Sequence, residues 1–145
     1  RLVIAGPPEN QAYADRLTKL VEDLDLKDRV DLRFGFHPRA DIARWANDAL
    51  VCAYLPFDED SVGYVTMEAF ACGKAVLTVT DSGGLLEIVS QDTGAVAEPT
   101  PQALADALDR LTSDKGRAIS LGGAARNLWR DKNVTWEQTV RRLLD

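Results

Sequence analysis

The chain has 145 residues, which suits one domain with a sizeable core, and 46% hydrophobic with 28% charged residues is a globular composition. The net charge of −6 argues against a nucleic-acid partner, because such surfaces normally present a basic face. No apolar stretch is long enough to cross a bilayer, so membrane contact is expected only through segments outside this sequence.

Strand and helix patterns then alternate along the chain. Short apolar runs predict buried strands within residues 2–6, 49–56 and 74–79. Alternating apolar residues predict a strand within 29–35, and a further short strand is predicted within 93–98. Helical spacing predicts helices after Asn10, within 39–49, from about Tyr64 to Cys72, within 85–89, from Pro101 to Asp114, and in the tail. This order predicts an α/β fold, a Rossmann-like parallel sheet with helices on both faces.

Ligands of such sheets bind at the carboxyl ends of the strands. We therefore expect the loops after Ala5, Phe34, Leu55 and Val79 to form one rim. The cysteines, Cys52 and Cys72, lie in apolar runs and form no metal-ligand pattern. Two buried free thiols fit a reducing compartment, so we expect a cytoplasmic protein with no metal site.

Two acidic residues flank the start of the predicted helix at Tyr64. Gly63 permits close backbone approach, and the first N–H groups of the helix, near Tyr64, Val65 and Thr66, offer a phosphate site. Glu68 can accept two hydroxyl groups of a ribose, and Asp60 can accept hydroxyls of a second sugar. On spacing alone, the simpler interpretation is favoured, in which Glu68 is a surface helix acid and Asp60 an acid at the helix start, because acids at this separation are common.

Two further features on the expected rim have two interpretations each. Gly83-Gly84 either presents amides to a phosphate or forms a tight turn with Ser82 as a helix cap. His37, the single histidine, either contacts a base or phosphate or is an exposed loop residue before Pro38. The loop "AGPPEN" lacks the glycines and amides of a phosphate loop, so we reject it as the main phosphate site.

Taken together, these residues resemble the retaining, nucleotide-sugar-dependent glycosyltransferases of the GT-B fold, the glycosyl transferases group 1. The carboxy-terminal domain of that family carries P-x-x-x-E-G-F-G-x-x-x-x-E-A-x-A-x-G-x-P-V, followed by G-G-x-x-E-(I/L)-V and x-x-G. The matching residues here, in order, are Pro56, Asp60, Gly63, Glu68, Ala69, Ala71, Gly73, Val76, Gly83, Gly84, Glu87, Ile88, Val89 and Gly94. The resemblance covers nearly the whole chain, so residues 1–145 resemble the nucleotide-sugar-binding domain, incomplete at its amino-terminal edge.

The resemblance implies a role for each matched residue. Glu68 would hold the ribose of a UDP-, GDP- or ADP-sugar donor, and Asp60 would hold hydroxyls of the transferred hexose. The backbone of Gly63, Tyr64 and Val65 would bind the diphosphate and sugar, and Gly83 and Gly84 would line the same rim. The loop that holds Phe36 and His37 would contact the base. No cofactor is implied.

The chain departs from the family pattern at the first acid. The family has Glu where this chain has the shorter Asp60, and the adjacent Glu59 competes for the same role. The G-F-G triplet is reduced to Ser61-Val62-Gly63, and Lys74 replaces the usual Pro.

The family also places an Arg and a Lys upstream of the segment that matches "RLVIAG", where they neutralise the departing diphosphate. Arg1 is too close to the strand to be that Arg. An amino-terminal domain would bind most of the acceptor, so we expect this chain to be inactive alone.

Two other functions remain as alternatives. A nucleotide-sugar epimerase can use the same fold, with its catalytic groups mostly outside this chain. A non-catalytic receiver-like α/β module would need a pair of acids after the first strand, where the sequence supplies only Glu9.

Overall fold

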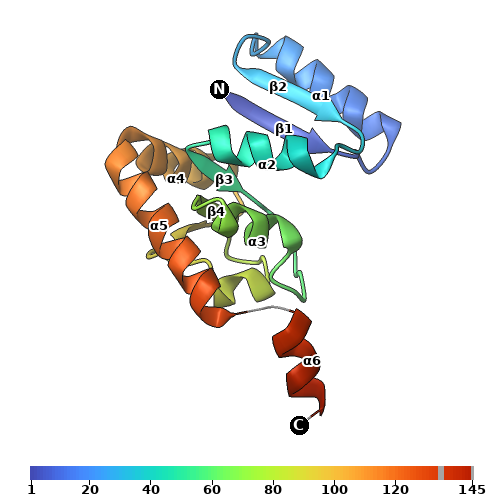
Figure 1. Ribbon diagram of the computed structural model, residues 1–145. Coiled ribbons are helices and arrows are strands. Elements are labelled where there is room, and N and C mark those ends of the chain that lie inside the picture. Colours follow the sequence, from blue (N-terminus) through green and yellow to red (C-terminus); the bar gives the residue numbers. More distant parts are fainter. Residues whose placement is uncertain (134–135, 145) are drawn as a thin grey trace. The chain divides into compact units, whose positions relative to one another are not determined.

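The computed structural model describes residues 1–133 and 136–144 (Figure 1). The chain divides into two compact units, residues 1–42 and 43–145, and each unit is described by itself. Both units are built from parallel strands joined by helices. The α/β class expected from the alternating patterns is therefore confirmed.

The first unit is a two-stranded parallel sheet with a crossover helix. Strand β1 (Leu2–Gly6) pairs with β2 (Val30–Phe34), in a register from Leu2 opposite Val30 to Gly6 opposite Phe34. Helix α1 (Gln11–Asp23) connects them. Its predicted cap is confirmed, since Asn10 Oδ1 accepts a hydrogen bond from the Tyr13 amide at 2.9 Å.

The prediction that β1 is buried is wrong for this unit. Leu2, Val3 and Ile4 are 47%, 39% and 38% exposed. Two strands and one crossover helix offer too little apolar surface to cover both faces of a strand. Helix α2 (Arg39–Asp48) follows and runs across the division between the units.

The second unit holds a three-stranded parallel sheet in the order β3-β4-β5. Its strands are β3 (Val51–Ala53), β4 (Ala75–Val79) and β5 (Gly94–Ala97). Its helices are α3 (Tyr64–Ala71), the 3₁₀ turn η1 (Gly84–Glu87), α4 (Pro101–Ser113), α5 (Lys115–Lys132) and α6 (Trp136–Leu144). The strand predicted within residues 49–56 is thus shorter, and the helix predicted at 85–89 is a single 3₁₀ turn.

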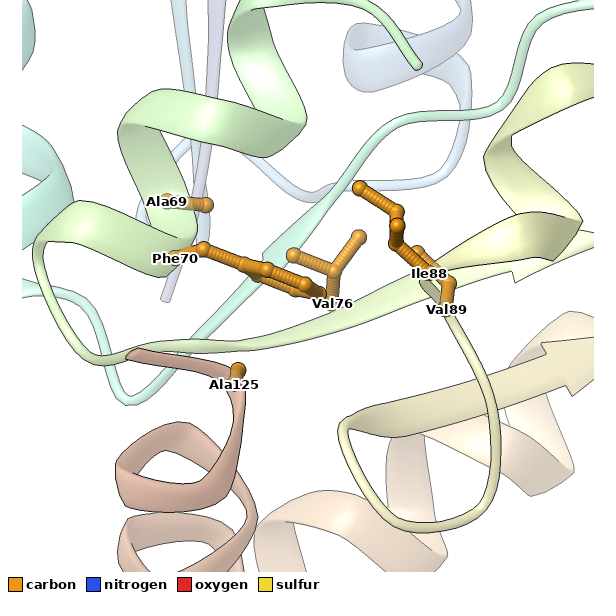
Figure 2. Packing of buried hydrophobic residues seen from close by; sticks show 6 residues of the cluster. All are labelled: Ala69, Phe70, Val76, Ile88, Val89 and Ala125. Carbon is orange, nitrogen blue, oxygen red and sulfur yellow. The ribbon is translucent and has the colours of Figure 1, made fainter. Parts of the chain in front are cut away.

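Strand β4 is the centre of this unit, and every one of its residues is buried. Successive side chains point to opposite faces of the sheet, so Val76 and Leu77 belong to different clusters. Val76 packs with residues of α3, the segment after η1 and α5, as Figure 2 shows for Ala69, Phe70, Ile88, Val89 and Ala125. Leu77 packs with Ala97 of β5 and with Ala107 and Leu111 of α4.

Helices therefore cover both faces of the sheet in this unit, as predicted. Within residues 1–133 and 136–144, the strands do not form one continuous sheet. Among the described residues, β1 and β2 form one ladder and β3, β4 and β5 form another. Each strand pairs with its nearest neighbour along the chain, and α2 carries the chain from the first ladder to the second. The four loops expected to form one rim are therefore described as two pairs, the loops after β1 and β2 in the first unit and the loops after β3 and β4 in the second.

Candidate functional site

The loops that follow β3 and β4 lie against each other at the carboxyl end of the second sheet. A parallel bridge joins Glu59 to Gly83, and the Gly84 amide donates to the Glu59 carbonyl oxygen at 2.7 Å. A second backbone bond runs from the Asp58 amide to the Asp81 carbonyl at 2.8 Å. These bonds place the predicted residues Asp60, Gly83 and Gly84 in one neighbourhood.

This contact explains why Gly83 and Gly84 are glycines. A Cβ on Gly83 would lie 2.3 Å from the Glu59 carbonyl oxygen, and Gly83 has a φ of +70°. A Cβ on Gly84 would lie 2.9 Å from the Ser61 carbonyl oxygen. Side chains at either position would push the two loops apart. The Gly84 amide is used in this packing, so it is not available to a phosphate in this conformation.

The interpretation in which Ser82 caps the following turn is wrong. Gly83 is the N-terminal cap of η1, with no side-chain cap bond, and Ser82 Oγ is buried without a hydrogen-bond partner among the described residues. The amides of Gly84 and Leu86 at this turn donate instead to the backbone carbonyl oxygens of Glu59 and Gly83.

The start of α3 leaves free amides at the same edge. Gly63 is its N-cap, and the amides of Thr66 and Met67 both donate to the Gly63 carbonyl oxygen, at 3.2 and 3.3 Å. The Thr66 amide is therefore not one of the free groups, contrary to expectation. Within the described part of the chain, the amides of Tyr64 and Val65 have no acceptor. Free amides at a helix N-terminus form a site for an anion.

Three carboxylates lie within five residues of this helix start along the chain, those of Glu59, Asp60 and Glu68, and they differ in how they are engaged. Asp60 and Glu68 are exposed, and neither has an ion pair or side-chain hydrogen bond among the described residues. Glu59 is partly buried, and both of its oxygens accept hydrogen bonds, from Tyr54 Oη at 3.2 Å and from Ser61 Oγ at 3.1 Å. Asp60 and Glu68 are therefore the carboxylates open to a ligand.

Phe36 and His37 belong to the first unit. Phe36 is 92% exposed. His37 is partly buried, and its Nε2 lies 2.9 Å from the Arg33 carbonyl oxygen. A carbonyl only accepts, so Nε2 carries the hydrogen in this contact and is not a free donor for a phosphate. The expected role of these two residues toward a base stays a prediction.

The sequence alone did not identify several polar groups near this edge. Tyr54 follows β3, and the sequence indicates only an apolar run there, although its hydroxyl donates to the Glu59 carboxylate. Thr66, Thr78 and Ser82 have buried hydroxyls with no partner among the described residues. Thr66 could have been placed inward from its position one helical turn before the buried Phe70. No spacing of residues in the sequence predicts the contact between Tyr54 and Glu59.

The rest of the described chain adds two observations. None of its helices is both long and apolar enough to cross a membrane. The same residues contain no cluster of three or more His, Cys, Asp or Glu side chains placed to hold a metal ion. The thiols of Cys52 and Cys72 are free and only partly buried, less than predicted.

Comparisons with known proteins relate the chain to glycosyltransferases. The family model for glycosyl transferases group 1 matches residues 1–128. A D-inositol 3-phosphate glycosyltransferase of Xylanimonas cellulosilytica is 34% identical over 100% of this chain and 34% of that protein. The chain therefore spans about a third of the length of the curated relatives it matches.

Solved structures agree with this relationship. The sucrose-phosphate synthase of Thermosynechococcus elongatus matches with a TM-score of 0.75 and 30% identity, over 99% of this chain and 38% of that one. HepE of Anabaena, in complex with UDP-glucose, matches with a TM-score of 0.81 and 25% identity, over 98% of this chain and 40% of that one. The family match over most of the sequence, together with the parallel sheets and the loop motif, shows that this chain belongs to the glycosyl transferases group 1 family.

Proposed function

We propose that this chain is the donor-binding domain of a retaining glycosyltransferase, which moves a hexose from a nucleoside diphosphate sugar to an acceptor hydroxyl. The observation that carries the proposal is the start of α3, where the unpaired amides of Tyr64 and Val65 lie in the sequence between Asp60 and Glu68, two exposed carboxylates without a partner among the described residues. Diphosphate, ribose and sugar hydroxyls together need this combination of donors and acceptors.

The helix start would bind the diphosphate through its free amides and its positive dipole end. Glu68 lies one turn further along α3, where its carboxylate would accept the two vicinal hydroxyls of the ribose. Asp60 would accept hydroxyls of the transferred sugar. We assign this role to Asp60 and not to Glu59, because both Glu59 oxygens already accept hydrogen bonds from Tyr54 and Ser61.

The two loops carry no positive side chain. Residues 54–68 and 80–89 contain neither Lys nor Arg, and Lys74 donates to the Asn47 carbonyl oxygen at 2.8 Å. The negative charge that develops on a departing diphosphate would therefore be neutralised only in part by these backbone amides. We propose that cationic groups and most of the acceptor site come from the remainder of the full-length protein, so that this chain alone is inactive.

The nature of the donor is also a proposal. HepE, which the chain resembles, was solved with UDP-glucose. Phe36 and His37, on the loop after β2, would contact the base, while Gly83 and Gly84 would shape the rim through the packing of the two loops. The donor is therefore a UDP-, GDP- or ADP-sugar.

A thermal-shift panel of UDP-, GDP- and ADP-sugars on the chain tests the proposal. A ligand at about 100 times its Kd adds roughly 2.7 kcal/mol to the unfolding free energy. For a domain of this size, that corresponds to a rise in Tm of roughly 5–10 °C. We expect a rise with one class of base, and we expect it to be lost in Glu68→Ala.

The matched control is Asp109→Ala, which removes an exposed helix acid from α4 and should keep the full shift. No shift with any donor at millimolar concentration, in a chain that melts cooperatively, would count against donor binding. Incubation of the full-length protein with donor and no acceptor separates transfer from epimerisation, because only an epimerase would convert the donor sugar.

A further inference from the structure

Glu59 lies at the centre of a hydrogen-bond chain that ends at the proposed donor site. Its Oε2 accepts from the Tyr54 hydroxyl at 3.2 Å, and its Oε1 accepts from the Ser61 hydroxyl at 3.1 Å. Ser61 Oγ in turn accepts from the Gly63 amide at 3.2 Å. The carboxylate of Glu59 therefore connects the end of β3 to the N-cap of α3.

The backbone of Glu59 makes a second connection, to the neighbouring loop. Its carbonyl oxygen accepts from the Gly84 amide at 2.7 Å, and Glu59 bridges Gly83 in parallel. One residue thus fixes the loop after β3 in two directions. Its side chain holds Tyr54 and Ser61, and its main chain holds the loop after β4.

Tyr54 anchors this arrangement to the sheet. Its amide continues the ladder of β3 by donating to the Leu77 carbonyl at 3.0 Å, and Leu77 is fully buried in β4. Its ring lies directly beneath Gly63, since a Cβ there would be 2.6 Å from Tyr54 Cε1. Burial, followed by the hydrogen bond to Glu59, raises the pKa of Tyr54, which keeps its hydroxyl protonated and able to donate.

We propose that Glu59 is a positioning residue that aims the free amides of Tyr64 and Val65 at the donor diphosphate, and that it does not touch the sugar. The proposal rests on the proposed function of the same site. The geometry supports it because the chain from Tyr54 through Glu59 and Ser61 ends on Gly63, the residue immediately before those amides. Asp60 is the next residue, is exposed and has no such engagement.

The two roles predict different losses of affinity for a nucleoside diphosphate and for its sugar conjugate. The probes are UDP and UDP-glucose, or the GDP or ADP pair if the wild-type chain selects that base, with Kd measured by calorimetry. Asp60→Ala should bind the plain diphosphate like wild type and lose only the extra affinity that the sugar provides. Glu59→Ala should weaken both ligands by the same factor, about tenfold, because a lost hydrogen bond to a charged group is worth about 1.5 kcal/mol.

Two conservative variants sharpen the test. Glu59→Gln keeps one oxygen that accepts a hydrogen bond from one of the two hydroxyls, of Tyr54 or Ser61, and its amide N–H can donate to the oxygen of the other. It should therefore retain affinity for the diphosphate within about twofold of wild type. Tyr54→Phe removes only the hydroxyl that donates a hydrogen bond to Glu59. It should lower the affinity for both ligands in parallel, by roughly three- to fivefold. Asp109→Ala serves again as the acid-to-alanine control without effect.

A readout without ligand separates this inference from the proposed function. Hydrogen exchange at the Gly63 and Gly84 amides should accelerate in Glu59→Ala and stay near wild type in Asp60→Ala, whether or not a donor binds. If wild type binds no nucleotide, the proposed function fails while the exchange result still decides whether Glu59 holds the loops. If Glu59→Ala loses only the sugar increment, or leaves both affinities and both exchange rates unchanged, Glu59 is not a positioning residue.

Discussion

Two adjacent glycines of α5 give opposite predictions for the same substitution. Gly122 is buried against the turn after α3, and a Cβ there would lie 2.0 Å from the Gly73 carbonyl oxygen. Gly123 is exposed, and a Cβ there would meet nothing within 4 Å. Both lie in the interior of the same helix, so Gly→Ala brings the same gain in helix propensity at each position.

The magnitudes follow from these distances. Gly123→Ala should raise the unfolding free energy by about 0.5–1 kcal/mol, the usual difference between glycine and alanine in a helix. Gly122→Ala gains the same amount, but its Cβ is more than about 1 Å short of ordinary contact with the Gly73 oxygen. The turn cannot yield easily, because the Gly73 and Lys74 amides donate to Phe70 and Ala69 carbonyls at 2.9 Å. Helix α5 would have to move outward, and overpacking of this kind costs about 1–3 kcal/mol.

Thermal unfolding of the two variants tests the reasoning. The propensity gain cancels between the two variants, so the overpacking cost of about 1 to 3 kcal/mol would separate their melting temperatures by roughly 2–12 °C, with Gly123→Ala above wild type and Gly122→Ala below it. Equal melting temperatures would show that α5 does not approach the Gly73 turn as closely as the structure has it. A lower Tm for Gly123→Ala would show that its exposed, uncrowded position is wrong.

Three further predictions concern the core, one ion pair and one thiol. Phe70 is fully buried, so Phe70→Ala should lower the free energy of unfolding, measured by urea denaturation, by about 3–5 kcal/mol. Leu143 is 79% exposed, and Leu143→Ala, the control, should change it by no more than about 0.5 kcal/mol. The hydrogen bond from Arg33 lowers the pKa of Asp31, so the stability that ionised Asp31 contributes is complete above its ordinary value of 3.8 and is lost as pH falls through the lowered value. The stability gap between wild type and Asp31→Asn, followed by thermal melts, should therefore be constant at neutral pH and shrink in acid, and a gap that widens in acid would contradict this sign. Burial raises the pKa of Cys52, so iodoacetamide should label it in Cys72→Ser more slowly than it labels a cysteine in a short unfolded peptide at pH 8, and equal rates would contradict its shielding.

The sequence predicts the local elements of this fold well because their signals are local. Asn10 accepts a hydrogen bond from a first-turn amide, and Pro101 at the first helical position has no amide hydrogen that needs an acceptor. The structure accordingly has helices beginning at Gln11 and Pro101. The apolar run at residues 75–79 is a buried parallel strand with helices on both faces. None of these inferences needs to know what lies far away in the sequence.

The division into two ladders could not be predicted in this way. Apolar runs identify strands, but the same pattern at residues 2–6 and 75–79 gives an exposed strand in one case and a buried one in the other. Burial depends on how many strands and helices join each ladder, which is a property of the assembled fold. The same limit applies to Glu59, whose engagement with Tyr54 depends on how the loop turns back beside the end of β3.

The glycines of the family motif have a structural meaning that separates fold from function. A Cβ on Gly83 would meet the Glu59 carbonyl at 2.3 Å, and one on Gly94 would meet the Val76 carbonyl at 1.9 Å. These positions are glycine because two backbones touch there, with no ligand required. A match at such glycines therefore identifies the packing of loops and strands, and it is equally compatible with any donor.

The information about the ligand must lie in side chains that the packing leaves unused. At this edge those are Asp60 and Glu68, which are exposed and unengaged, whereas Glu59 is used by the loop itself. Substitutions at the glycines should accordingly lower stability and donor affinity together. Substitutions at Asp60 and Glu68 should lower affinity while leaving the Tm without ligand almost unchanged, because surface positions of this kind contribute little to stability.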